Sequence, residues 1–110
     1  MEIIHPEPAT LRPISAHGSV GLTAQALLRA ETTAVTVLRV APGGEIGDHP
    51  ARGDQTLLIT EGSGQVRSGA GPWHDVTAGD AVRWAAGESH TTRSAAGLTA
   101  VAIEVSGHGG

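Results

Sequence analysis

Five residue types are absent from this 110-residue chain, namely cysteine, lysine, asparagine, phenylalanine and tyrosine, so Trp73 and Trp84 are its only large aromatic residues. Without cysteine, the chain has no disulfide framework and no thiolate metal ligand. The net charge is -4 and the arginines are scattered, which argues against a nucleic-acid partner. No signal-like segment and no apolar run of about 18 residues occurs, so we expect a cytoplasmic protein that does not bind membranes.

Glycine, by contrast, is abundant, and the 16 glycines and 6 prolines separate short runs of Val, Leu, Ile, Thr and Ala. No long segment shows helical periodicity, so we predict a single all-β domain. Strands at this spacing are typical of a sandwich or a barrel. We expect strands over residues 22–28, 32–40, 55–60, 65–68, 73–76, 81–84, 90–93 and 98–105, a turn over 42–44, and chain reversals over 61–64 and 69–72.

The two ends of the chain are expected to differ from the barrel. Prolines near the start predict an irregular arm. We assign residues 1–30 to this arm and the first strand or strands of the same domain, residues 31–106 to the barrel, and residues 107–110 to a flexible tail. Trp84 is expected to fill the core, because it has a large area to bury and no aromatic companions.

Two glycine-bounded segments carry polar residues of the kinds that bind metal ions. In the first segment, Gly43 precedes His49 with five residues between them, and Ala51 follows two positions after His49. Gln55 comes after three further residues, and Gly62 after six more. An imidazole and a carboxamide are therefore placed at the two sides of a short connection between expected strands.

The second segment has a similar organisation around one histidine. Gly79 is followed by Ala85, Gly87, His90 and Ser94. Taken together, the two segments resemble the paired motifs of the cupins, G(X)5HXH(X)3,4E(X)6G and G(X)5PXG(X)2H(X)3N. The likeness covers roughly residues 35–104, and the spacing fits at every step.

The resemblance implies a double-stranded β-helix, a jelly-roll barrel in which the two motifs face one another across the barrel mouth. In this family, the motif His and Glu side chains typically converge on a divalent metal. Two positions depart from that pattern, because Ala51 stands where the second His is expected and Gln55 stands where the Glu is expected. The ligand set that carries over is His49, Gln55 and His90.

A neutral set of two imidazoles and one amide leaves a divalent ion with its full formal charge. We therefore expect weaker affinity than a site with a carboxylate, and stronger polarisation of a bound anionic molecule. The loss of the carboxylate weakens the case for iron(II) oxygenase chemistry in particular. Zn, Ni, Cu and Mn are as plausible as Fe.

Two other residues offer a carboxylate. If His49 is taken as the second His of the motif, Asp54 becomes the acid, but Glu61 then falls where Gly62 should stand. Glu88 lies two residues before His90 and could also turn inward. A simpler interpretation also stays open, in which His49 is a loop histidine, His90 a rim histidine and Gln55 a buried amide that only satisfies its neighbours. We expect no role for the other histidines, His74 on a solvated edge and His5, His17 and His108 in terminal segments.

The function expected from this resemblance is a small metal-binding cupin, a metalloenzyme that acts on a small molecule coordinated in the barrel mouth. The alternative is a non-catalytic binding or sensor protein with a partly lost metal site, since the fold does not select among these activities. We also expect a homodimer. The strand over residues 22–28 has no evident partner in a minimal barrel, and edge-to-edge pairing would cover it.

Overall fold

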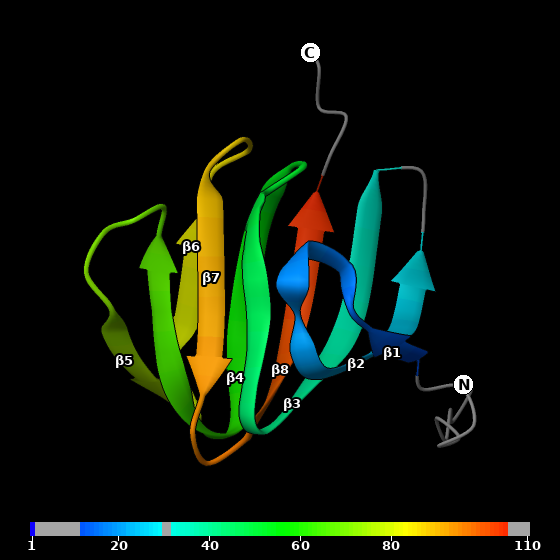
Figure 1. The fold of residues 1–110 in the computed structure, drawn as a ribbon. Helices are drawn as coiled ribbons and strands as arrows, with labels where there is room; N and C mark the ends of the chain where they lie inside the picture. Colours follow the sequence, from blue (N-terminus) through cyan, green and yellow to red (C-terminus); the bar gives the residue numbers. More distant parts are fainter. Residues whose placement is uncertain (2–11, 30–31, 106–110) are drawn as a thin grey trace.

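The computed structural model describes residues 1, 12–29 and 32–105. His5, His108, most of the expected arm and the expected tail at 107–110 lie outside these described residues. Within them the chain is all-β, with one short 3-10 turn and no α-helix (Figure 1). The elements are β1 (Arg12–Ile14), η2 (Ala16–Gly18), β2 (Val20–Arg29), β3 (Thr33–Pro50), β4 (Asp54–Ser68), β5 (His74–Thr77), β6 (Ala81–Trp84), β7 (Ser89–Ser94) and β8 (Leu98–Val105).

All neighbouring strands are antiparallel, and they form two walls. One wall has the order β1-β2-β3-β8-β4-β6, and the other joins the second halves of β3 and β4 through β7, with β5 at its edge. Figure 1 shows β7 in front and β8 behind. The predicted jelly-roll barrel is confirmed.

The long strands β3 and β4 cross from one wall to the other, which the sequence did not predict. The expected turn at residues 42–44 and the expected reversal at 61–64 are both wrong, because each strand bends there and continues. Gly43 and Gly62 have φ angles of 79° and 78°, a conformation that glycine adopts without strain. β4 also has an irregularity between Ile59 and Glu61. A bulge and a left-handed glycine change the partner strand without reversing the chain.

The strand expected over residues 22–28 is confirmed as part of β2, but it does not lack a partner. β2 pairs with β3 on one side and with β1 on the other. The reason given above for edge-to-edge dimerisation is therefore wrong.

The core lies between the two walls and is almost entirely aliphatic. Trp84 joins it with 3% of its surface exposed, as predicted. Leu57 and Ile59 on β4 are the most buried large side chains of the cluster. In the described part of the chain, no helix is long and apolar enough to cross a membrane.

Candidate functional site

A cavity of about 310 Å³ opens inside the barrel, and it is lined by all three predicted ligands. His49 comes from β3, Gln55 from β4 and His90 from β7. Leu38 and Leu57 supply apolar wall. Residues from three different strands therefore meet at one cavity, as the resemblance to the cupins implied.

His49 and His90 are direct neighbours. They are paired across β3 and β7, next to an irregularity in the pairing after Ile46. Their ring centroids are 4.4 Å apart, with the planes tilted by 55°. Trp84 stacks on His90, with 4.3 Å between ring centroids and 22° between planes. The His90 ring therefore contacts both an indole and a second imidazole.

His90 is 2% exposed, and neither its Nδ1 nor its Nε2 has a hydrogen-bond partner. Burial, and then the neighbouring His49, lower the pKa of His90 to about 4. The ring is therefore neutral at neutral pH, with one nitrogen lone pair available. A buried polar group without a partner costs about 1–3 kcal/mol, so this arrangement calls for a bound group that the protein itself does not supply.

His49 is half-buried, and its Nδ1 lies 2.8 Å from the carbonyl oxygen of Gly47. Because a carbonyl only accepts hydrogen bonds, Nδ1 must donate. In the neutral ring the lone pair is then on Nε2. A backbone carbonyl that fixes the tautomer in this way is a common support for a metal-binding histidine.

Gln55 is 8% exposed and begins β4, where it is paired with Trp84 on β6 and with Glu104 on β8. Glu104 lines the same cavity. A carboxylate at position 55 would lie opposite Glu104, and like charges on paired strand positions are destabilising. The neutral amide at position 55 avoids that repulsion.

His17 is a site residue that we did not expect. It lies in η2, its ring stacks on His49 with 4.9 Å between centroids, and it lines the cavity. The expectation that His17 has no role because it lies in a terminal segment is therefore wrong about its position. Its φ of 58° is the only positive value among the described non-glycine residues.

Gly47 explains how η2 reaches the site. A Cβ at this position would lie 1.6 Å from the carbonyl oxygen of His17, so only glycine allows the turn to dock on β3. The Gly47 N–H donates to the buried Ser19 Oγ at 3.0 Å, and its carbonyl accepts from His49. One glycine therefore positions both histidine rings.

The two alternative carboxylates do not line the cavity. Asp54 is exposed and its Oδ1 accepts a hydrogen bond from the Ala86 N–H at 3.0 Å. Glu88 is held by the Ser68 hydroxyl and the Ala85 N–H, which lower its pKa in that order. The carboxylate that does reach the cavity is Glu104, which the motif comparison did not single out. Along β8 it lies on the same side as the buried Leu98 and Ala100, whereas Val101, Ile103 and Val105 lie on the other side.

The donor set fits a weak metal site. Within residues 12–29 and 32–105, no three His, Cys, Asp or Glu side chains are grouped so that they could hold one metal ion. The remaining set is His49, Gln55 and His90, in which His90 has unpaired ring nitrogens and His49 has a fixed tautomer. These residues can supply nitrogen and amide-oxygen ligands without a charge.

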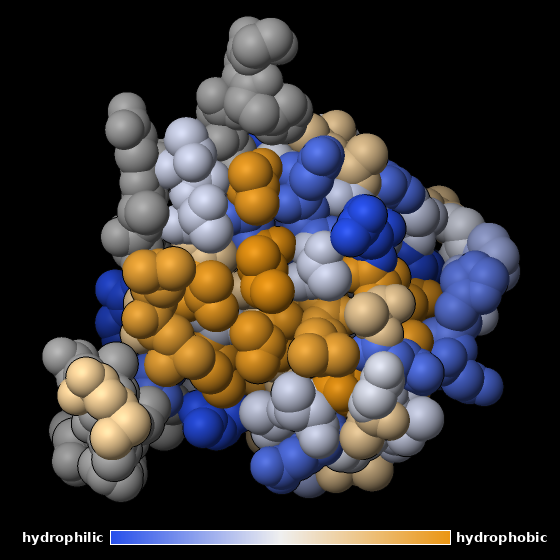
Figure 2. All heavy atoms as spheres, turned by 180° about the vertical axis from the view of Figure 1, so that it is seen from behind, coloured by the Kyte–Doolittle hydropathy of each residue, from blue (hydrophilic) through white to orange (hydrophobic). Residues whose placement is uncertain are grey.

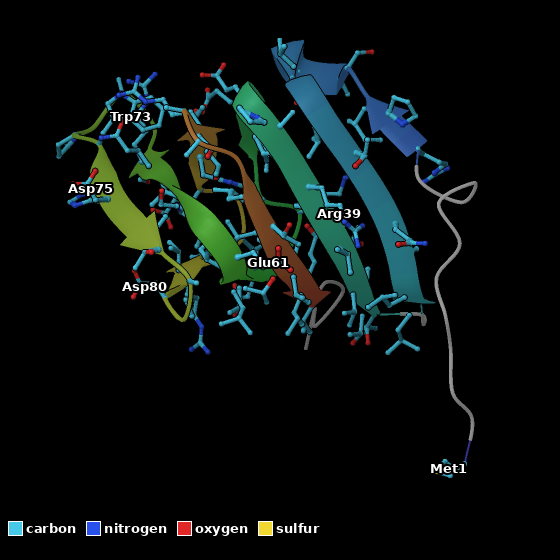
Figure 3. All side chains as sticks on the ribbon, turned by 90° about the horizontal axis from the view of Figure 1, so that it is seen from below. Met1, Arg39, Glu61, Trp73, Asp75 and Asp80 are labelled. Atoms are coloured by element: carbon cyan, nitrogen blue, oxygen red, sulfur yellow. The ribbon has the colours of Figure 1, made fainter. Side chains whose placement is uncertain are left out.

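A larger groove of about 720 Å³ lies elsewhere and is lined by none of these residues. It runs beside β5 and is lined by Asp75 and Asp80, which lie at one end of the molecule in Figure 3. We place the site in the smaller cavity, because its lining includes the buried His90 ring, whose two nitrogens lack partners.

A cupin domain family model matches residues 36–106, which is more than half of the chain. The chain belongs to the cupin family. No curated protein matches the sequence. The two motifs of this cupin are therefore the segments around His49 and His90 described above.

Solved structures resemble this cupin over nearly its whole length. The polyketide cyclase RemF from Streptomyces resistomycificus is 19% identical, with a TM-score of 0.83 over 96% of this chain and 79% of that one. A predicted oxalate decarboxylase from Thermotoga maritima is 22% identical, with a TM-score of 0.80 over 93% and 98%. A Cupin 2 conserved barrel domain protein from Salinispora arenicola is 24% identical, with a TM-score of 0.76 over 94% and 87%. At these identities the likeness shows the fold alone.

Proposed function

We propose that this cupin is a metalloenzyme that binds a divalent ion through His49, Gln55 and His90 and acts on a small molecule in the barrel mouth. The observation that supports this proposal is the buried His90 ring, whose two nitrogens have no partner inside the protein. Beside it, the tautomer of His49 leaves a lone pair on Nε2.

The protein residues at this site fix the orientation of the His90 ring and keep it unprotonated. The rings of Trp84 and His49 both pack against the His90 ring, so its orientation is fixed before any ligand arrives. Burial keeps His90 unprotonated, and a neutral imidazole is the form that binds metals. A divalent ion bound here would polarise an oxygen of the substrate as a Lewis acid.

The substrate is a small molecule with oxygen donors. The cavity of about 310 Å³ is at the small end of the usual range for ligand pockets, about 300–1,000 Å³. Leu38 and Leu57 give it apolar walls, while His17 and Arg52 add hydrogen-bond donors to its lining. Two similar structures are named for reactions on oxygen-rich compounds, a polyketide and oxalate, which supports a substrate of that kind.

A second candidate is a protein that binds a polar metabolite directly, without metal and without catalysis. The absence of a three-residue cluster of His, Cys, Asp or Glu among the described residues favours it. The same imidazole nitrogens and amide would then bond to the metabolite itself.

Metal analysis separates the two candidates. We expect protein purified without a histidine tag or chelator to hold one divalent ion, and calorimetry of the stripped protein with Zn, Ni, Cu, Mn and Fe(II) to give one site. His49→Ala and His90→Ala should each abolish stoichiometric binding, because two donors do not offset dehydration of the ion. His74→Ala is the matched control, since His74 is exposed on β5.

Two results would count against the metal. Binding that survives His90→Ala but not His74→Ala would mean that the site lies elsewhere. Stripped protein that takes up none of these ions, yet is stabilised by oxygen-rich metabolites in a His90-dependent way, would favour the direct-binding candidate.

A further inference from the structure

The two walls of the barrel have different outer surfaces. On the wall that contains β8 the outer surface is apolar, and Figure 2 shows its apolar side chains gathered on that side of the molecule. On the wall that contains β7 the outer surface is polar. His90 and Thr92 of β7 line the cavity, so Thr91 and Arg93, which alternate with them, lie on the outside.

One row of polar residues crosses the outside of the β7 wall. Glu45 on β3 is paired with Arg93, and Arg93 is paired with Gln65 on β4. Gln65 is paired in turn with Asp75 on β5. All four residues line the groove of about 720 Å³. The row therefore brings a carboxylate to each of its ends and one guanidinium between them.

Hydrogen bonds hold Arg93 in place without neutralising it. Gln65 Oε1 accepts from Arg93 Nε at 2.8 Å and from Arg93 Nη2 at 2.6 Å, and Gln65 Nε2 donates to Asp75 Oδ1 at 2.9 Å. The Arg93 Cζ also lies 3.8 Å from the centroid of the Trp73 ring. Because an amide and an indole carry no charge, the guanidinium is oriented and stays a free cation.

Arg67 brings a second guanidinium to the same indole. Its Cζ lies 4.4 Å from the centroid of the Trp73 ring, and its Nε is buried without a hydrogen-bond partner. Arg67 is paired with Thr91, whose hydroxyl donates to Asp48 instead, at 3.3 Å. Within residues 12–29 and 32–105, no carboxylate oxygen lies within 4.0 Å of the nitrogens of either guanidinium. Two like charges are therefore held at one ring with no anion beside them.

These features are the ones that an oxyanion site needs. The planar fork of a guanidinium matches the oxygens of a carboxylate or a phosphate, and such charge-assisted hydrogen bonds are stronger than neutral ones. The indole attracts the cations to its ring face, but it does not replace the oxygens to which a guanidinium donates. An oxyanion at this position would relieve the repulsion between the two arginines and give the buried N–H an acceptor.

We propose that Arg67 and Arg93 bind an oxyanion, the carboxylate or phosphate group of a small molecule whose hydrogen-bond donors lie along the groove. Glu45 supports the second part of the proposal. It is half-buried, lines the groove and is paired with Arg93, yet it forms no ion pair with it in the described part of the chain, because the Arg93 side chain is turned to Gln65 and Trp73. A free carboxylate beside the anion site favours a molecule with ammonium or hydroxyl groups near its acid group.

This site is separate from the one inside the barrel. The groove and the cavity that contains His90 share no lining residue. Binding of an oxyanion outside the β7 wall therefore depends neither on a metal ion nor on the proposed enzyme activity.

Calorimetric titration of the metal-free, full-length protein with two pairs of probes tests the site. Succinate and aspartate differ by one ammonium group, and inorganic phosphate and a hexose phosphate differ by the hydroxyl groups of the sugar. We expect one pair to bind, and its member with more donors to bind at least about threefold more tightly than the other. The pair that binds distinguishes a carboxylate site from a phosphate site.

Matched arginine variants locate the binding. Arg67→Gln and Arg93→Gln should each weaken it by about tenfold or more, because each removes a charge-assisted donor. Arg52→Gln is the control, since Arg52 lines the inner cavity instead, and its affinity should equal that of the parent. Glu45→Gln should remove the advantage of the probe with more donors.

A further variant blocks the site while keeping both arginines. Gln65→Glu combined with Asp75→Asn places a carboxylate on Arg93 and preserves a donor and an acceptor between positions 65 and 75. This double variant should weaken oxyanion binding by about tenfold, because Arg93 is then neutralised within the chain. Circular dichroism of every variant shows whether the fold is retained.

Three results would overturn the proposal. The first is the absence of binding by all four probes at millimolar concentration. The second is an affinity that Arg67→Gln or Arg93→Gln leaves unchanged. The third is binding that Arg52→Gln removes, which would place the anion inside the barrel. Equal affinity for the two members of the pair that binds would overturn the role of Glu45.

Discussion

The strands β7 and β8 lie on opposite walls of the barrel. The polar strand is the more buried of the two, and the apolar strand is the more exposed. β7 is polar, yet His90, Thr91, Thr92 and Ser94 are at most 3% exposed. β8 is mostly apolar, yet Ile103 and Val105 are 37% and 40% exposed. In most domains the apolar strand is the better covered of the two. Each strand therefore indicates a partner that the single chain does not supply.

The two strands lack different contacts, so the groups that could supply these contacts also differ. On β7, Ser94 and Thr91 find hydrogen-bond partners within the chain, Ser63 and Asp48, and only His90 does not. One unpaired ring calls for a small, directional ligand. On β8 the deficit is an extended apolar area, which a flat surface of similar shape covers better than a small molecule does.

The largest effect that we expect from this contrast is a loss of stability at acidic pH in the metal-free protein. Folding lowers the pKa of His90 from its ordinary value of 6.5 to about 4, chiefly through burial. Between these values the unfolded chain binds a proton at His90 and the folded chain does not. Stability is therefore complete above pH 6.5 and falls as the pH drops to about 4, by on the order of 2–3 kcal/mol.

Urea unfolding at several pH values measures this loss, and His90→Leu is the control. The leucine variant should lose less stability across the same window, and near pH 7 it should be more stable than the parent by about 1 kcal/mol because an unpaired polar ring is removed. Carboxylates titrate in both proteins, so the difference between them isolates His90. Equal pH slopes for the two proteins would show that His90 is not buried as the structure has it.

The second effect concerns how the inner site is built. Gly47→Ala places a methyl group where the His17 carbonyl lies, so η2 must leave β3. We expect a cost of about 1–3 kcal/mol in the free energy of unfolding. We also expect weaker metal binding, because the carbonyl that fixes His49 moves with the strand. Thermal unfolding and calorimetry measure both quantities.

Gly71→Ala is the matched control for Gly47→Ala. Gly71 also lacks a positive φ, and a Cβ there would meet only the Ser68 carbonyl oxygen, at 3.0 Å. That substitution should change the stability by less than about 1 kcal/mol and leave metal binding as it is. Equal effects of the two substitutions would mean that η2 does not dock through Gly47.

Much of the fold and part of the site could be predicted from the sequence. The strands at 81–84 and 98–105 are observed with the predicted bounds, because a glycine stands shortly before and shortly after each of them in the sequence. The meeting of His49 and His90 was expected from the resemblance to the cupin motifs. The local sequence pattern and the family resemblance were sufficient where the position of a strand or a side chain depends on residues that are close in sequence.

The rest depends on contacts between distant segments. His17 is 32 residues before His49, and nothing in its own neighbourhood indicates that Gly47 leaves room for its carbonyl. The continuation of β4 through Gly62 likewise depends on Gly97, whose carbonyl lies so close that a Cβ on Gly62 would be 2.2 Å from it. The direction of Glu104 could not be predicted either, because alternation along β8 would place the more apolar Val101, Ile103 and Val105 inward, whereas Ile103 and Val105 are exposed.

The smallest effect that we expect concerns the missing carboxylate, and it sharpens the contrast between a neutral inner site and a charged one. Gln55→Glu adds a negative charge beside His90, and should tighten binding of a divalent ion by about tenfold, or 1.4 kcal/mol.

In the metal-free protein the same change should cost stability, because the new carboxylate is paired with Glu104 across β4 and β8. The double variant Gln55→Glu/Glu104→Gln keeps the charge of the cavity at its present value, so it should retain the tighter binding and recover the stability. Calorimetric titration and thermal unfolding of the parent and both variants measure these differences. Affinity at or below that of the parent, in a protein whose circular dichroism is unchanged, would show that position 55 does not face the ion.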